Sequence, residues 1–213
     1  MKRFSWEKRI LKPAVFLLSL APMAVLLWRA ASGTFGANPI EDITEETGIW
    51  TLRFLVITLS VTPLCTITGW SPAGSFRRMF GLFAFFYGFL HFSTYLALDQ
   101  FFAFHEILRD VAKRPFITVG FASFILMIPL ALTSPHRVVR WMGGKRWRLL
   151  HRTVYAVALG GVIHYLWLVK ADTSRPLRYG VILAMLFLFR LWTYLSSKRR
   201  AAGSANRSGP RAE

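Results

Sequence analysis

The stretch RWRLLHRTVYAVALGGVIHYLW, residues 146–167, decides how this sequence folds. It opens with Arg146 and Arg148 and continues as an apolar run, the pattern of a helix that enters a bilayer from its positively charged side. The run carries two histidines, His151 and His164, although ionisable side chains inside a bilayer are costly and mark functional sites. These residues therefore predict a membrane helix with a chemical role.

Five further apolar stretches of similar length surround this one. Since roughly 20 helical residues cross a bilayer, the six stretches predict an all-α integral membrane protein, a six-helix transmembrane bundle. The predicted spans are residues 10–28, 48–69, 79–98, 116–133, 149–169 and 179–196. Apolar residues make up 54% of the 213-residue chain. A soluble fold of this size cannot hide that much apolar surface, so lipid must solvate part of it.

We expect one domain, residues 1–198, and a disordered cytoplasmic tail, residues 199–213, because the tail is rich in Ser, Gly and Ala and lacks aromatic residues. The first apolar stretch has an alternative interpretation. Cations precede it and small residues follow it, as in a cleavable signal peptide. Cleavage would leave five helices with unchanged orientation.

Charge asymmetry orients the predicted bundle, because cytoplasmic loops carry an excess of Lys and Arg. The cations before the first span, in the second and fourth loops and after the last span all fall on one side, and most acidic residues fall on the other. We therefore expect both termini to be cytoplasmic. The cations are Lys2, Arg3, Lys8, Arg9, Lys12, Arg77, Arg78, Arg137, Arg140, Lys145, Arg146, Arg148, Lys198, Arg199 and Arg200. The acidic residues are Glu41, Asp42, Glu45, Glu46, Asp99, Glu106, Asp110 and Asp172.

Composition excludes two classes of function. The net charge of +17 would suit a nucleic-acid binder, but the cations form short clusters between apolar runs and no continuous basic stripe. We therefore expect membrane lipid, and no nucleic acid, as a partner. Cys65 is the only cysteine, which excludes an internal disulfide and a Cys/His zinc pattern.

A third histidine, His91, lies in the predicted span 79–98. Neutral imidazole is a good axial ligand for haem iron, and a haem is an apolar disc suited to the space between helices. One such histidine is more often a hydrogen-bonded core residue, whereas three at matched depths favour iron ligation. Two other histidines, His105 and His136, fall in predicted loops, and we do not expect them to bind iron.

Depth assigns the three histidines to two levels. His151 and His164 are 13 residues apart, which is roughly 20 Å of helix rise, so one lies near each membrane face. His91 falls at the level of His164, and the two can bridge an outer haem. Arg77 precedes His91 by 14 residues and is level with His151. An inner haem would therefore have His151 on one side and Arg77, or nothing, on the other.

The same spacing raises two geometric questions. On a regular helix the side chains of His151 and His164 would point roughly 140° apart, so this helix must be distorted, or the haems approach it from different sides. Gly160 and Gly161 could permit a bend or a porphyrin, or could be packing contacts. Arginine is a poor iron ligand because it is normally protonated, so Arg77 could instead pair with a haem propionate or anchor its helix.

Three segments carry a family resemblance: WEKRILKP at residues 6–13, GLFAFFYGFLHF at 81–92 and the stretch 146–167. Through them the chain resembles the ferric reductase-like transmembrane domain family, over nearly its whole length up to about residue 198. The resemblance implies one or two b-type haems, held by His91 and His164, with His151 at an inner site. The wider family has a fourth histidine where Arg77 stands, which leaves the inner site's second ligand open.

The short chain is most similar to the branch of this family that serves methionine sulfoxide reduction in the bacterial periplasm. That resemblance implies a b-type cytochrome subunit of the inner membrane, without a sulfoxide-reducing site of its own. It would pass electrons from the quinone pool, or from a cytoplasmic flavin reductase, to a periplasmic molybdopterin-containing methionine sulfoxide reductase subunit. FMN is a further possible cofactor by resemblance. The alternatives are a stand-alone ferric or quinone reductase of the same fold, and a haem-free transporter or assembly factor whose histidines relay protons.

Overall fold

The computed structural model describes residues 3–207 and places side chains for residues 9–70 and 73–199. Within residues 3–207 it contains helices and no strand, so the all-α prediction is confirmed. The helices are α1 (Arg3–Ser32), α2 (Pro39–Thr68), η1 (Ser71–Phe76), α3 (Arg77–Thr94), η2 (Tyr95–Asp99, a π-helix), α4 (Phe104–Lys113), α5 (Pro115–Leu132), α6 (His136–Met142), α7 (Gly144–His151), α8 (Val154–Leu168) and α9 (Ser174–Arg207).

Five helical segments of the described chain are long and apolar enough to cross a membrane: residues 9–32, 39–68, 73–99, 115–132 and 174–199. They coincide with the predicted first, second, third, fourth and sixth spans. The predicted fifth span is divided between α7 and the 15-residue α8. The chain is therefore a multi-pass membrane protein, and the count of six spans stays a prediction.

The division falls between His151 and His164. Arg152 N–H bonds to Leu149 O at 3.2 Å and Thr153 N–H bonds to Leu150 O at 3.0 Å, so the backbone tightens to i→i−3 bonds at this point. The helix is thus distorted, which is one of the two arrangements that the 13-residue spacing of these histidines required.

Four helices surround the centre of the bundle. Helix α2 packs against α3 and α8, and α5 also packs against α3 and α8. Helices α3 and α8 therefore lie diagonally across from each other, as do α2 and α5. Helix α9 covers the outer side of α2 and α8.

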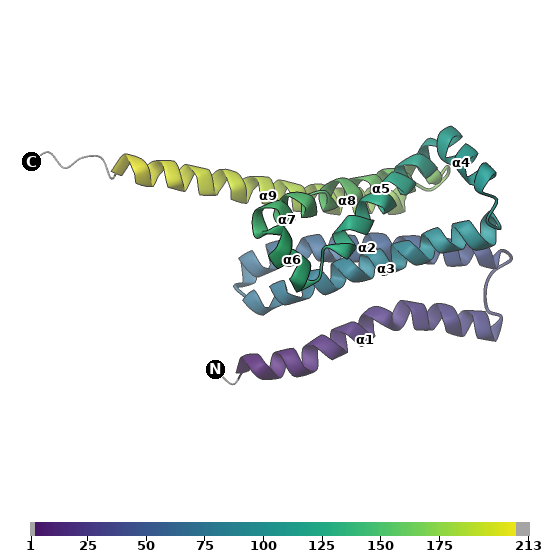
Figure 1. The fold of residues 1–213 in the computed structure, drawn as a ribbon, viewed down its shortest axis with the longest axis horizontal. Helices are drawn as coiled ribbons and strands as arrows, with labels where there is room; N and C mark the ends of the chain where they lie inside the picture. The colour runs from purple at the N-terminus through teal and green to yellow at the C-terminus, as the bar shows by residue number, and fades with distance from the viewer. Residues whose placement is uncertain (1–2, 208–213) are drawn as a thin grey trace, which may run out of the picture.

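Helix α1 lies along the edge of this bundle, beside α3 (Figure 1). The contact centres on Tyr87, whose side chain is fully buried. Its hydroxyl donates to Ser19 O at 2.9 Å and accepts from Met23 N–H at 3.2 Å. Met23 N–H and Ser19 O are the donor and acceptor of one i→i−4 hydrogen bond of α1. Tyr87 therefore contacts α1 next to Pro22, which lacks a backbone N–H and weakens the helix there.

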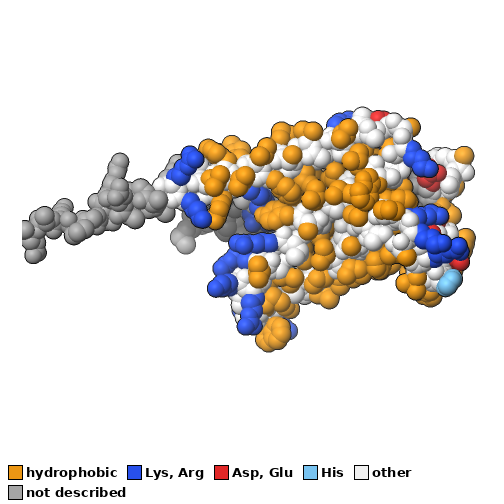
Figure 2. All heavy atoms as spheres, turned by 90° about the horizontal axis from the view of Figure 1, so that it is seen from above, with side chains coloured by type: hydrophobic (Ala, Val, Ile, Leu, Met, Phe, Trp, Pro, Cys, Tyr) orange, Lys and Arg blue, Asp and Glu red, His pale blue; other side chains and the backbone are white. Residues whose placement is uncertain are grey.

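The face of the bundle seen in Figure 2 is mainly apolar along its middle, with Lys and Arg gathered at its two ends. Helix α1 begins and α9 ends at the same end of the bundle (Figure 1). The cytoplasmic placement of that end stays a prediction. Helix α9 continues to Arg207, and residues 208–213 of the predicted disordered tail lie outside the described residues.

Candidate cofactor site at the centre of the bundle

His91 of α3 and His164 of α8 meet on one diagonal of the four-helix arrangement. Their ring centroids are 6.1 Å apart and their planes make an angle of 81°. Both residues are partly buried between the neighbouring helices. The structure thus brings together the two histidines that the sequence placed at one level.

The other diagonal supplies a backbone carbonyl to each ring. His91 Nδ1 lies 2.9 Å from Thr44 O of α2, and His164 Nδ1 lies 2.6 Å from Phe116 O of α5. A carbonyl oxygen only accepts, so Nδ1 is the protonated nitrogen of each ring. Nε2 of each ring therefore keeps its lone pair, which is the form in which imidazole binds a metal.

A glycine lies against each ring, four residues after the residue whose carbonyl binds it. A Cβ added at Gly48 would lie 3.1 Å from His91 Nδ1, and one added at Gly120 would lie 2.6 Å from His164 Nδ1. Residues i and i+4 share one helix face, so a side chain at i+4 would block access to the carbonyl of residue i. The same arrangement occurs twice, once on α2 and once on α5.

The separation of the two rings is compatible with both binding one metal ion. A metal–imidazole bond of about 2 Å on each side, plus about 1 Å from nitrogen to ring centre, would put the ring centroids roughly 6 Å apart, and those of His91 and His164 are 6.1 Å apart. Bundle cores commonly hold cofactors between facing helices. Within the described residues, no three His, Cys, Asp or Glu side chains gather as they would around a bare metal ion.

His151 is held differently at the opposite level. Its Nε2 lies 3.0 Å from Thr133 Oγ1, and the indole of Trp147 stacks on its ring at a centroid distance of 4.0 Å. The Thr133 hydroxyl also lies 2.6 Å from Pro129 O. When it donates its proton there, Nε2 of His151 is the donor in their contact and Nδ1 is the lone-pair nitrogen of the ring.

Three arginines lie near this inner level. Arg78 of α3 is close enough to His151 to interact with it electrostatically. Arg77, which the sequence placed level with His151, interacts in the same way with Arg190 of α9. The structure does not test whether Arg77 serves an inner haem, and that role stays a prediction.

Arg190 ties three helices together. Its guanidinium donates to Tyr155 Oη at 2.6 Å, to Leu59 O at 2.8 Å and to Thr62 Oγ1 at 3.3 Å. Its Nε is buried and has no hydrogen-bond partner among the described residues. An unpaired buried donor of this kind fits an anionic group of a bound cofactor.

The remaining sequence candidates lie elsewhere. His105 and His136 are exposed at the two ends of the bundle. Gly160 leaves no room for a Cβ because of Ser123 Oγ on α5, which makes it a helix packing contact. The carbonyls of Thr44 and Phe116 and their paired glycines were not foreseen, and the four-residue spacing within each pair is the only signal that the sequence holds.

Comparison with known proteins adds a family and several close relatives. The family model of the ferric reductase like transmembrane component matches residues 47–162. The chain is 46% identical over 202 residues to the protein-methionine-sulfoxide reductase heme-binding subunit MsrQ of Herminiimonas arsenicoxydans, covering 92% of this chain and 93% of that protein. It is 53% identical over 182 residues to the MsrQ of Azospira oryzae, covering 85% and 78%, and 45% identical over 196 residues to that of Ralstonia nicotianae, covering 91% and 90%. No solved structure matches it.

Proposed function

The chain belongs to the ferric reductase-like transmembrane family, and on that premise we propose that it is a haem-binding membrane subunit of a protein-methionine-sulfoxide reductase system. In this role it passes electrons across the inner membrane to a periplasmic molybdopterin-containing partner that reduces methionine sulfoxide in oxidised proteins. The electrons come from the quinone pool or from a cytoplasmic flavin donor. Both termini face the cytoplasm.

The observation that carries this proposal is the pair His91 and His164, each with Nδ1 on a carbonyl and Nε2 free. A b-type haem held by this pair would supply one-electron transfer at the centre of the bundle. The carbonyls of Thr44 and Phe116 fix the tautomer and rotation of the rings and increase their basicity as ligands. The apolar helices exclude water, which sets the local dielectric and hence the reduction potential.

A second, inner haem would use His151. The outer pair needs no change of hydrogen bonding to bind iron, whereas His151 must use Nδ1 or give up its contact with Thr133. Arg77, Arg78 and Arg190 would supply positive charge for the propionates of a haem bound at this level, and the unpaired Nε of Arg190 would supply a hydrogen-bond donor.

The haem content of single variants tests the outer site. We expect His91→Ala and His164→Ala each to lose the outer haem in a pyridine haemochrome assay per mole of purified protein. His105→Ala is the matched control, because this exposed histidine lies on the same side of the membrane, and it should keep full haem. Full haem in both bundle variants would contradict the proposal.

The partner is tested separately. Reduced protein should be reoxidised by the purified methionine sulfoxide reductase catalytic subunit and not by ferric chelates. The opposite result would support a stand-alone ferric reductase of the same fold.

A further inference from the structure

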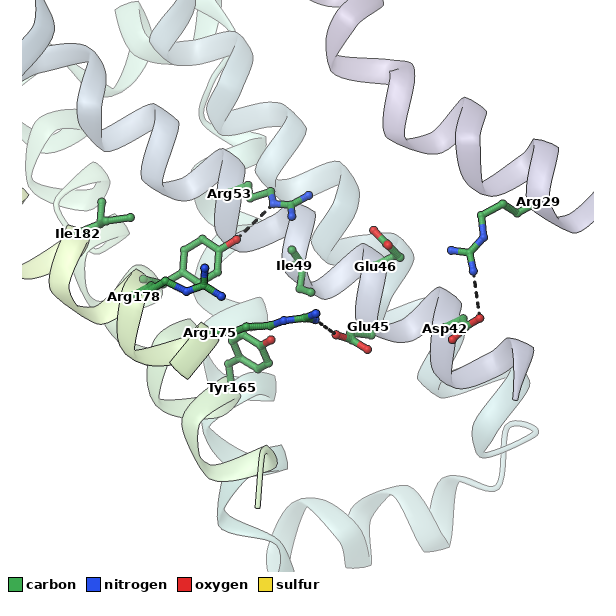
Figure 3. Close-up of a pocket in the computed structure, with 11 residues that line it drawn as sticks. Arg29, Asp42, Glu45, Glu46, Ile49, Arg53, Tyr165, Arg175, Arg178 and Ile182 are labelled. Carbon is green, nitrogen blue, oxygen red and sulfur yellow. Dashed lines mark hydrogen bonds and ion pairs between the residues drawn. The ribbon is translucent and has the colours of Figure 1, made fainter. Parts of the chain in front are cut away.

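A cavity of about 620 Å³ opens at the end of the bundle that carries the acidic loops, between α1, α2, α8 and α9 (Figure 3). Its volume is in the range of sites for small ligands, roughly 300 to 1,000 Å³. It lies on the side of α2 away from the bundle centre, and none of the residues proposed to bind haem lines it.

The wall of this cavity carries four arginines and three carboxylates. Two pairs neutralise each other at its rim: Arg29 with Asp42 at 3.2 Å, and Arg175 with Glu45 at 3.1 Å. The charges left over are those of Arg53, Arg178 and Glu46. Within the described residues these three make no ion pair.

Arg53 is the deepest of these charges. Its guanidinium stacks on the Trp50 ring at 4.4 Å, and its Nε donates to Tyr179 Oη at 3.3 Å. It follows Gly48, the first residue of the span predicted from the sequence, by five residues, which is about 7 Å of helix rise, and it lies well inside the apolar helical segment 39–68. A cation at this depth without a carboxylate partner favours an anionic ligand.

The remaining groups are ordered by depth. Helices α2 and α9 both run inward from this end, so Glu46 lies above Arg53, and Arg178 lies above Ile182. The ion pair Arg175–Glu45 and the hydrogen bond Arg53–Tyr179 set the register of the two helices, which puts Arg178, next to Tyr179, near the level of Arg53 and below Glu46. From the aqueous side inward, the cavity therefore presents a carboxylate, then two guanidinium groups, then an apolar side chain. Figure 3 shows these labelled side chains on the two facing helices.

We propose that this cavity binds the head group of an outer-leaflet phospholipid that carries a primary ammonium, as in phosphatidylethanolamine. In the outer leaflet such a lipid presents ammonium outermost, phosphate below it and acyl chains deepest, which is the order of Glu46, Arg53 with Arg178, and Ile182. The ammonium donates to Glu46, and the phosphate accepts from the two arginines. The lipid would bridge α1 to α2 and α9 at the only end where α1 forms an ion pair with the described part of the bundle.

Lipid binding to delipidated protein in detergent, measured by native mass spectrometry, tests this inference. The probes are phosphatidylethanolamine, phosphatidylglycerol, which lacks the ammonium, and inorganic phosphate. We expect one phosphatidylethanolamine per protein, bound more tightly than phosphatidylglycerol. Glu46→Gln should remove this preference, and Arg53→Gln should weaken both lipids about tenfold, the effect of losing a charged hydrogen bond.

Matched controls and a second variant keep the test decisive. Glu106→Gln and Arg109→Gln alter an exposed ion pair on α4 outside the cavity, and should change nothing. If Arg53→Gln fails to fold, Arg178→Gln replaces it, because Arg178 is exposed and its loss leaves the core intact. Haem content is measured on the same preparations. Lipid binding that is lost while haem is kept separates this site from the proposed function.

Three outcomes would overturn the inference. The first is an unchanged lipid preference in Glu46→Gln. The second is binding of inorganic phosphate without binding of lipid. The third is stoichiometric displacement of the lipid by a short-chain quinol, which would make the cavity a quinol site.

Discussion

Substitution of Gly120 by Ala is the sharpest probe of the central histidine pair. The new Cβ would lie 2.6 Å from His164 Nδ1 and 2.9 Å from its Cε1, whereas ordinary contact begins at 3.4 Å. The ring would have to move by roughly 0.8 Å, away from the Phe116 carbonyl that it now contacts at 2.6 Å. When a metal-binding imidazole loses the hydrogen bond on its other nitrogen, the affinity for the metal typically falls tenfold to a hundredfold, which is about 1.4 to 2.7 kcal/mol.

The neighbouring glycines give a graded series. At Gly48 the new Cβ would lie 3.1 Å from His91 Nδ1, so a shift of a few tenths of an ångström suffices and Gly48→Ala should have a smaller effect. At Gly81 the nearest atom, Thr58 Cγ2, is 3.8 Å away, so Gly81→Ala is the control. Alanine is a better helix former than glycine, so all three variants should fold.

The assay is titration of haem into apoprotein, followed by Soret absorption, with thermal unfolding of the apoprotein measured in parallel. We expect the dissociation constant to rise most for Gly120→Ala, less for Gly48→Ala and not for Gly81→Ala, with similar unfolding temperatures. Equal haem affinity in Gly120→Ala and Gly81→Ala would refute the prediction that Gly48 and Gly120 leave the space in which His91 and His164 take up their haem-binding positions.

Three further predictions concern the scaffold. Tyr155→Phe removes the 2.6 Å acceptor of Arg190 Nη1, so thermal unfolding should show a loss of about 1 to 3 kcal/mol, while Tyr194→Phe, on the exposed part of α9, should show none. Tyr87→Phe removes both hydrogen bonds to α1 beside Pro22, so limited proteolysis should release α1 faster than in the parent, and equal rates would argue against this anchor. The Ser174 hydroxyl and backbone N–H bond to Asp172 and hold the pKa of its carboxyl below its ordinary value. Its stabilising contribution is therefore present above that ordinary value and lost as the pH falls through the lowered pKa, a dependence that should disappear from acid unfolding curves of Asp172→Asn.

The sequence predicted what depends on distance along a helix. A fixed rise per residue sufficed to place His91 level with His164. The residue count between His151 and His164 required either a distorted helix or haems that approach it from different sides, and the structure shows the distortion. Five of the six predicted spans have their counterparts in the described helices, because apolar length alone defines them.

The sequence did not reveal what depends on rotation about a helix axis. The rotation of α2 and α5 about their own axes sets whether Gly48 and Gly120 face a histidine. The sequence of a strongly apolar helix does not indicate this rotation, because the helix has no polar face. For the same reason, the sequence did not show that Arg78, the neighbour of Arg77, lies close enough to His151 to interact with it electrostatically. The sequence also did not reveal the outer cavity, because side chains of α1, α2, α8 and α9 that are far apart in the chain line it.

The crossed arrangement at the centre has a practical consequence. Each of the rings of His91 and His164 belongs to one helix and contacts a carbonyl of a different one, so the pair couples all four central helices. A shift of any of them, whether caused by bilayer thickness, detergent or a docked protein, would alter the tilt of a ring. The optical and magnetic spectra of a bound haem should therefore change when any of the four central helices shifts.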